Sequence, residues 1–422
     1  MGGEPFLLKA DIRNFDNVAY NISSKGSIDI GKLYQLFAVK GYQVKGSIYT
    51  DVAFKGLQSD AMSGRYSKLN NSGRMVVKGL NLRSDLFPEP FLIKNGVFSF
   101  FQDKMKFERF QAVYGKSDFS VNGYMSNIIN YVLADNAKLT GNFNFLSNRI
   151  YADEFMAYSN SAAPSSAAPA GVIMIPDNLN VKLSANSAVV YYNDLEIKDA
   201  KGTMTLNNGT LSLIQTGFKL IGAPVTMDAT YKSLNPRSAT FNYHILASEF
   251  DVARAYKEIR LFREMATSAS KVKGIIGLDY QLSGKLNQEM YPVFPTLKGG
   301  GVLSVKKVSL MGFKMMNAVS KATGRDSLNN PDVSTVNIKT TIKNNIITIE
   351  RFKMRIAGFR PRFEGQVSFD GRLNMSGRLG LPPFGIIGIP LSITGTQEQP
   401  KVALKRNKEG KLEETEEQED TK

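Results

Sequence analysis

Few residues in this chain are of a type and in a position to carry out catalysis. The single histidine, His244, lies in the strand-like run TFNYHILAS, and the chain has no cysteine. Nucleophilic catalysis needs a nucleophile activated by a neighbouring base. The G-x-S-x-G pattern of a nucleophile elbow does not occur in the sequence. We therefore interpret His244 as a structural residue and predict no catalytic residue.

Two aspartates are the remaining candidates for acid–base chemistry. Asp51 and Asp279 occupy equivalent positions in two similar stretches, VKGSIYTDVAFKGLQSDAM from Val44 and VKGIIGLDYQLSGKLNQEM from Val272. A catalytic carboxylate pair must lie close together, whereas equivalent positions of a long repeat lie far apart. We therefore expect both aspartates on the polar face of a sheet.

Phosphate and metal sites find no support in the residue spacing. The glycines of residues 299–301 are not followed by the G-K-[ST] of a phosphate-binding loop. One histidine and scattered carboxylates form no metal-ligand cluster. The sequence therefore predicts no metal and no cofactor, and it favours a protein that is not an enzyme.

The charge balance suggests an anionic partner. The chain has 422 residues and a formal net charge of +15, although its C-terminus, residues 405–422, is rich in acids. The basic residues form no compact block and no stacking platform with aromatic residues, so we predict no nucleic-acid partner. Two readings stay open, namely attraction to anionic lipid head groups and ordinary solvation of strand faces.

Most of the sequence alternates apolar and polar residues, which is typical of half-buried strands. Residues 44–55, 272–283, 363–369 and 372–379 show this pattern. Tight turns are predicted at Asp370–Gly371 and, before further strands, at Asn95–Gly96, Asn208–Gly209 and Asn344–Asn345. The expected fold class is mainly β, a long, curled, repetitive antiparallel β-sheet forming a groove or trough, with a few short α-helices.

The organisation of the chain follows from the repeat and from composition. We expect a β-rich half over 1–158, an Ala/Pro/Ser linker over 159–171, a second β-rich half over 172–404 and a disordered tail over 405–422. Asp29 and Asp251 are candidate caps of short helices, and the spacing of Met311, Met315 and Val319 predicts a third. No run is long and apolar enough for a membrane-spanning helix.

A one-sided apolar sheet could bind acyl chains, whose transfer from water is favourable by ~0.8 kcal/mol per CH₂. The candidate groove-lining residues are Val44, Ile48, Val52, Phe54, Ile276, Leu278, Tyr280, Leu282, Phe363, Val367, Phe369, Leu373 and Met375. Two other interpretations remain, namely a structural or interaction protein with a closed core and strands embedded in a membrane.

The C-terminal part of the sequence resembles a known family. The stretch from Asn344 to Pro382 and the following IPLSITGTQEQPKVAL resemble the C-terminal region of AsmA-family envelope proteins of the Bacteroidetes type. The positions that carry the resemblance are Gly365, Phe369, Gly371, Leu373, Gly377, Gly395 and Pro400.

The resemblance implies a Gram-negative protein of the periplasm and cell envelope that transfers phospholipid between membranes and supports outer-membrane assembly. It implies phospholipid or another acyl-chain lipid, an anionic membrane surface, and inner- and outer-membrane proteins as partners. Relatives are anchored in the inner membrane by an N-terminal helix. No such helix is recognised here, so we expect either a fragment or a soluble relative.

Overall fold

The computed structural model describes residues 6–31, 42–84, 87–134, 137–155, 171–265, 270, 272–310, 314–328, 332–333 and 335–405. The expected fold class is confirmed, because strands predominate and the helices among the described residues are short. The chain divides into two compact units. No helix in the described ranges is long and apolar enough to cross a membrane.

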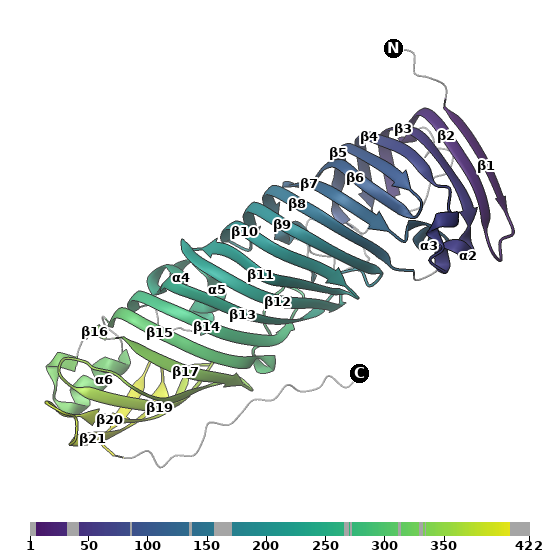
Figure 1. The fold of residues 1–422 in the computed structure, drawn as a ribbon. Coiled ribbons are helices and arrows are strands. Elements are labelled where there is room, and N and C mark those ends of the chain that lie inside the picture. The colour runs from purple at the N-terminus through teal and green to yellow at the C-terminus, as the bar shows by residue number, and fades with distance from the viewer. Residues whose placement is uncertain are drawn as a thin grey trace. The chain divides into compact units, whose positions relative to one another are not determined.

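Among its described residues the first unit has nine complete strands and two short helices, and Figure 1 shows their arrangement. The strands are β1 (Leu7–Arg13), β2 (Ala19–Asp29), β3 (Tyr42–Leu57), β4 (Ser72–Ser84), β5 (Phe87–Phe101), β6 (Lys104–Tyr114), β7 (Ser117–Ser126), β8 (Leu139–Tyr151) and β9 (Leu179–Tyr192). The helices are α2 (Gln58–Met62) and α3 (Ile128–Leu133), with 3₁₀ turns η1 (Tyr66–Lys68) and η2 (Ala152–Phe155).

Strands β1 to β8 pair in chain order, each antiparallel to the next. Strand β9 then pairs with β8 in the parallel sense, from Leu139 against Leu179 to Tyr151 against Tyr191. This parallel pair is an exception within the mostly antiparallel sheet that we expected. Parallel neighbours need a crossover of a dozen or more residues, and residues 152–178 provide it.

The second unit contains a further run of strands. They are β14 (Val272–Leu286), β15 (Lys298–Leu310), β16 (Asp332–Val333), β17 (Val336–Lys343), β18 (Ile346–Lys353), β19 (Arg360–Ser368), β20 (Arg372–Gly380), β21 (Gly388–Thr396) and β22 (Pro400–Ala403). Its helical elements are α4 (Val252–Glu258), α5 (Arg260–Met265), α6 (Lys314–Thr323), η4 (Phe294–Thr296) and η5 (Asp326–Leu328). Within the described residues, the strand pairs from β14 to β22 are all antiparallel.

Four strands contribute residues to both units. They are β10 (Leu195–Asn207), β11 (Thr210–Leu220), β12 (Ala223–Asn235) and β13 (Ser238–Asp251). The linker predicted over 159–171 lies outside the described residues except for Gly171, and the tail predicted over 405–422 lies outside them except for Lys405. The predicted domain boundaries therefore stay predictions.

Three of the four predicted turns are confirmed. Asp370–Gly371, Asn208–Gly209 and Asn344–Asn345 each separate two consecutive strands. Asn344 and Asn345 both have positive φ, 46° and 66°, as a tight hairpin turn requires.

The fourth turn prediction, Asn95–Gly96, is wrong. Strand β5 continues through both residues, and its register with β6 shifts between Ile93 and Asn95. A glycine inside a strand often marks a bulge or a close approach. Here a Cβ on Gly96 would lie 2.8 Å from the Phe98 ring.

The repeated V-K-G stretch forms the same element twice. It starts at Val44 in β3 and opens β14 at Val272, and each strand pairs with the strand that follows it. Gly46 and Gly274 have positive φ, 136° and 143°, and the register shifts at or just beyond each of them. Gly46 is skipped in the pairing of β3 with β4 and therefore lies at a bulge, whereas Gly274 pairs with Val308 just before an irregularity. At both positions the missing side chain tolerates the positive φ.

Both predicted helix caps lie in the described residues, but only one of the two helices does. Asp251 accepts a hydrogen bond from the Arg254 backbone N–H at 2.8 Å and caps α4, as predicted. The helix expected to continue from it is divided at Ile259 into α4 and α5. Asp29 accepts a hydrogen bond from the Gly31 N–H, but the rest of that predicted helix lies outside the described residues. The third predicted helix is α6, whose Val319 is buried.

Candidate functional site

The first unit presents one continuous apolar face across its strands. Residues that are paired between neighbouring strands share a face of the sheet. The central row of paired residues, from β4 to β9, is Met75, Phe98, Phe107, Gly123, Phe143 and Leu183. The flanking rows are Phe100, Met105, Met125, Gly141 and Val181, and Gly96, Phe110, Val121, Phe145 and Ala185. We call these three rows the apolar face.

The predicted residues of β3 extend the apolar face by one strand. Ile48 pairs with Val77, and Val52 pairs with Gly73 in the row of Phe100. Phe54 meets Phe100 edge to face, with ring centroids 5.1 Å apart. Ile48, Val52 and Phe54 therefore lie on the same apolar surface as the phenylalanines of β5, whereas Val44 pairs with Leu82 outside these three rows.

Aromatic rings on the apolar face contact one another across neighbouring strands. Phe107 meets both Phe98 and Phe143 edge to face, at centroid distances of 4.9 and 5.1 Å. Such edge-to-face pairs are each favourable by about 0.5–1.5 kcal/mol beyond area burial. The rings thereby form a fixed hydrocarbon surface rather than a set of independent side chains.

Glycines leave room for these rings. A Cβ on Gly141 would lie 2.6 Å from the ring of Phe143, and one on Gly123 would lie 2.2 Å from the Asn142 carbonyl oxygen. Both positions belong to the apolar face, where an apolar side chain would otherwise be expected. The glycines therefore let Phe143 lie flat along the sheet.

The apolar face keeps part of its surface accessible. Six of its residues and neighbours form a buried cluster, namely Val77, Phe98, Phe107, Phe143, Val181 and Leu183. Others packed against this cluster stay half-buried, among them Ile48, Phe100, Phe110, Val121 and Phe145. A hydrocarbon chain lying along this face would remove the remaining apolar surface from water, which is favourable in proportion to its area.

The opposite face of the same strands carries a polar row beside a row that includes Val76 and the buried Val97. Its central row of paired residues is Asp51, Arg74, Ser99, Lys106, Tyr124, Asn142 and Lys182. The first unit therefore separates apolar and charged residues onto two faces, which is the result expected of strict alternation.

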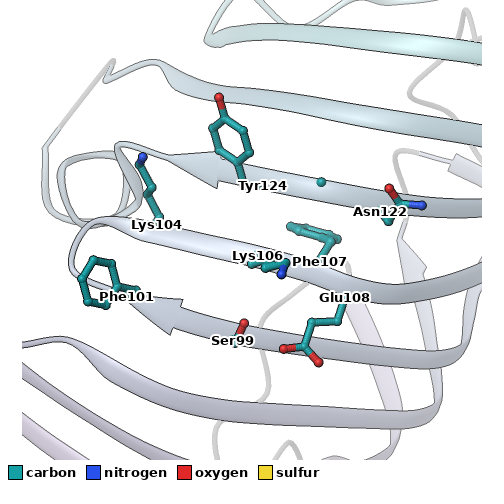
Figure 2. Close-up of a pocket in the computed structure, with 9 residues that line it drawn as sticks. Ser99, Phe101, Lys104, Lys106, Phe107, Glu108, Asn122 and Tyr124 are labelled. Atoms are coloured by element: carbon teal, nitrogen blue, oxygen red, sulfur yellow. The ribbon is translucent and has the colours of Figure 1, made fainter.

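A shallow cavity of about 650 Å³ lies between β5, β6 and β7, lined mostly from the polar face (Figure 2). The Lys104 ammonium lies over the Tyr124 ring at 5.5 Å, and Glu108 pairs with Arg74 at 3.5 Å. Glu108 is the single carboxylate among the nine lining residues, which include no histidine. This cavity therefore has neither a paired acid and base nor a set of metal ligands.

The other predicted groove residues fall in the second unit, in two environments. Ile276, Leu282, Phe363, Leu373 and Met375 are buried, whereas Leu278, Tyr280, Val367 and Phe369 are half-buried. Of the β3 candidates, Val44, Ile48, Val52 and Phe54 are all half-buried. The structure thus brings the β3 candidates together on the apolar face and places several of the later candidates inside packed clusters.

Packing against α6 explains the buried candidates. Phe363, Leu373 and Met375 belong to a cluster that includes Met316 and Val319 of α6. Leu282 belongs to a second cluster with Leu297 and Ile342. In these clusters protein side chains already fill the apolar side of the strands.

The tyrosines that border the second cluster have raised pKa values, which reflect their burial. Desolvation raises the pKa of Tyr243 to about 12, and burial also raises the pKa of Tyr280. The Tyr280 hydroxyl and Thr340 Oγ1 are 2.7 Å apart. These phenols stay neutral at physiological pH and act as polar edges of an apolar cluster.

The candidate chemical residues contact neighbouring polar side chains. His244 Nε2 lies 2.7 Å from Asp279 Oδ1 on partly exposed side chains. Asp51 lies 3.8 Å from the Lys25 ammonium, across the pairing of β2 with β3. Within the described ranges, no group of three or more histidine, aspartate or glutamate side chains could hold a metal ion.

Sequence reasoning missed the phenylalanines of β5, β6 and β8 as site residues. Part of the signal is present in the sequence, because GNFNFL alternates apolar and polar residues. In MKFERFQAV two charged residues separate Phe107 from Phe110, and the register shifts there, which breaks the simple alternation.

Comparisons with family models, curated proteins and solved structures found no match for this chain. The resemblance to the AsmA family, with the setting that it implies, therefore stays a prediction.

Proposed function

We propose that this chain is a non-enzymatic lipid-handling protein whose apolar face in the first unit binds the acyl chains of phospholipid. The observation that carries the proposal is the continuity of this face, with paired apolar residues or glycines in three adjacent rows from β5 to β9. An acyl chain needs an extended apolar surface and no directional hydrogen bonds, and a row of strands supplies such a surface.

The cellular setting belongs to the same proposal. The resemblance to AsmA-family proteins supports transfer of phospholipid between the membranes of a Gram-negative envelope and a contribution to outer-membrane assembly. The net charge of +15 supports attraction to anionic membrane surfaces.

One structural feature favours an alternative function. In the second unit, α6 and the strands around Phe363 form a packed cluster of protein side chains. A chain built wholly in this way would be a structural or interaction β-repeat protein of the envelope without lipid cargo.

The two functions are separated by a matched pair of adjacent phenylalanines. Phe100 is half-buried on the apolar face, whereas Phe101 is 66% exposed at the end of β5 and pairs with Lys104. The experiment compares Phe100→Asp with Phe101→Asp. It measures lipid that co-purifies from the native host by mass spectrometry and cross-linking to a photoreactive fatty acid.

We expect the wild-type protein and Phe101→Asp to carry lipid and to cross-link, and Phe100→Asp to lose both signals. Circular dichroism verifies that each variant is folded. Absence of lipid and of cross-linking in the wild-type protein would overturn the proposal in favour of the alternative function.

A further inference from the structure

The loop between β20 and β21, residues 381–387, exposes three large apolar side chains. We call it the tip loop. Phe384, Ile386 and Ile387 are 67%, 78% and 74% exposed, respectively. Single exposed apolar residues are common on protein surfaces, but clusters of them mark interaction sites. Three such residues within four positions therefore indicate an interaction site.

Hydrogen bonds hold the backbone of the tip loop in place. The Gly385 N–H donates to the Leu381 carbonyl at 2.8 Å, and the Leu381 N–H donates to the Ile387 carbonyl at 2.8 Å. The Leu381 side chain packs against the buried cluster that contains Phe363. The loop thus keeps one apolar residue inward and presents the other three outward.

Arginine side chains surround the base of the tip loop. The Arg378 guanidinium donates to the carbonyl oxygens of Gly385 and Ile386. Arg360 lies alongside, since a Cβ on Gly385 would be 3.0 Å from the Arg360 Cβ. These two arginines lie next to the exposed apolar residues and leave the loop with a positive border.

A second loop adds to this border. Residues 354–359 join β18 to β19, and a Cβ on Gly358 would be 3.7 Å from Pro382 Cγ in the tip loop. This second loop carries the exposed Arg355. Neither residues 354–363 nor residues 371–397 contain an aspartate or glutamate. The net charge of these two segments is therefore positive, because they contain arginines and no acidic residue.

We propose that the tip loop docks the second unit onto an anionic bilayer by inserting Phe384, Ile386 and Ile387 among the lipid chains. A membrane interface offers an apolar layer beneath a layer of phosphates. The apolar side chains at the tip correspond to the apolar layer, and the arginines at the base correspond to the phosphate layer. The arginines bind the phosphates while the apolar side chains leave water.

This docking site is independent of the proposed acyl-chain binding. It involves residues of the second unit only, and it binds a membrane surface rather than an extracted lipid. Loss of docking and loss of lipid cargo can therefore be measured separately on the same chain.

The test is flotation of the full chain with vesicles of equal parts phosphatidylcholine and phosphatidylglycerol. The tip variant combines Phe384→Ser, Ile386→Ser and Ile387→Ser. We expect it to bind these vesicles about a hundredfold more weakly than the wild-type chain, because three apolar side chains no longer enter the bilayer.

The matched control is Phe15→Ser, which removes an 83% exposed phenylalanine from the turn between β1 and β2. We expect it to bind vesicles as the wild-type chain does. The tip variant should keep the thermal unfolding transition of the wild-type chain, because the replaced side chains are solvent-exposed.

A charge variant tests the second half of the proposal. Arg360→Gln should weaken binding to the mixed vesicles about fivefold, and vesicles of phosphatidylcholine alone should bind the wild-type chain far more weakly. Equal binding of the wild-type chain and the tip variant to the mixed vesicles would overturn the proposal. A second result would also overturn the proposal. In it, the wild-type chain does not bind the vesicles, and sedimentation velocity shows that the chain self-associates through its tip loop.

Discussion

The rings of Phe98 and Phe107 meet edge to face across β5 and β6, at residues that are directly paired in the sheet. Both rings are buried, although they belong to a face on which many neighbours are only half-buried. They therefore form the packed floor of the apolar face, and the half-buried residues form its accessible part.

Replacing a floor residue should cost stability. We expect Phe107→Ala to lower the free energy of unfolding by about 3–4 kcal/mol, because it removes a buried ring and leaves a cavity. Urea unfolding followed by circular dichroism measures this change. Phe101→Ala, at an exposed site on the same sheet, should stay within about 0.5 kcal/mol of wild type. Equal losses for the two variants would contradict the assignment of Phe107 to the packed floor.

The glycine beneath the rings should not accept a side chain. Gly123 has φ +146°, and an added Cβ would lie 2.2 Å from the Asn142 carbonyl oxygen. We expect Gly123→Ala to lower the unfolding free energy by about 2 kcal/mol or more, because strain at such sites is large. The control is Gly217→Ala in β11, where nothing lies within 4 Å of an added Cβ. A neutral Gly123→Ala variant in the same unfolding assay would contradict this account.

Asp118 should make stability depend on pH. Burial opposes its ionisation, but hydrogen bonds from the backbone N–H groups of Arg149 and Asn148 outweigh that effect and lower the Asp118 pKa. A lowered pKa adds stability above the unfolded value of about 3.9, and this stability is lost as the pH falls through the folded value.

We therefore expect Asp118→Asn to be less stable than wild type at pH 7 by about 1 kcal/mol at most, because the carboxylate is partly solvated. The difference should shrink below about pH 4. Thermal unfolding of both proteins across this range measures it, and a difference that does not change with pH would speak against the proposed hydrogen bonds.

The buried cluster of the second unit should behave as protein core. We expect Met375→Ala to lower the unfolding free energy by about 2–4 kcal/mol, with no change in co-purified lipid per folded molecule. Unfolding and lipid mass spectrometry on the same preparation measure the two effects. Loss of lipid without loss of stability would instead show that Met375 lines a lipid site.

Local features of the fold were predictable from the sequence. Period-two alternation identified β3, β14, β19 and β20. Asp370–Gly371 identified the turn between β19 and β20, and Asn344–Asn345 identified the turn between β17 and β18. Asp251 predicted the start of α4, because a helix N-terminus depends on one capping side chain that accepts a hydrogen bond from a nearby backbone N–H. These signals depend on neighbours within a few residues, so they can be read directly from the chain.

The sequence by itself thus determined that the chain forms strands with one apolar and one polar side. Only the tertiary structure decided which apolar sides stay accessible. Ile48 and Met375 look alike in the alternating pattern, but Met375 packs in a cluster with residues of α6 and Ile48 remains half-buried. The parallel pairing of β8 with β9 and the continuation of β5 through Asn95 were likewise decided by distant segments. The physical reason is that alternation fixes the direction of each side chain, whereas burial depends on what packs against it from elsewhere in the chain.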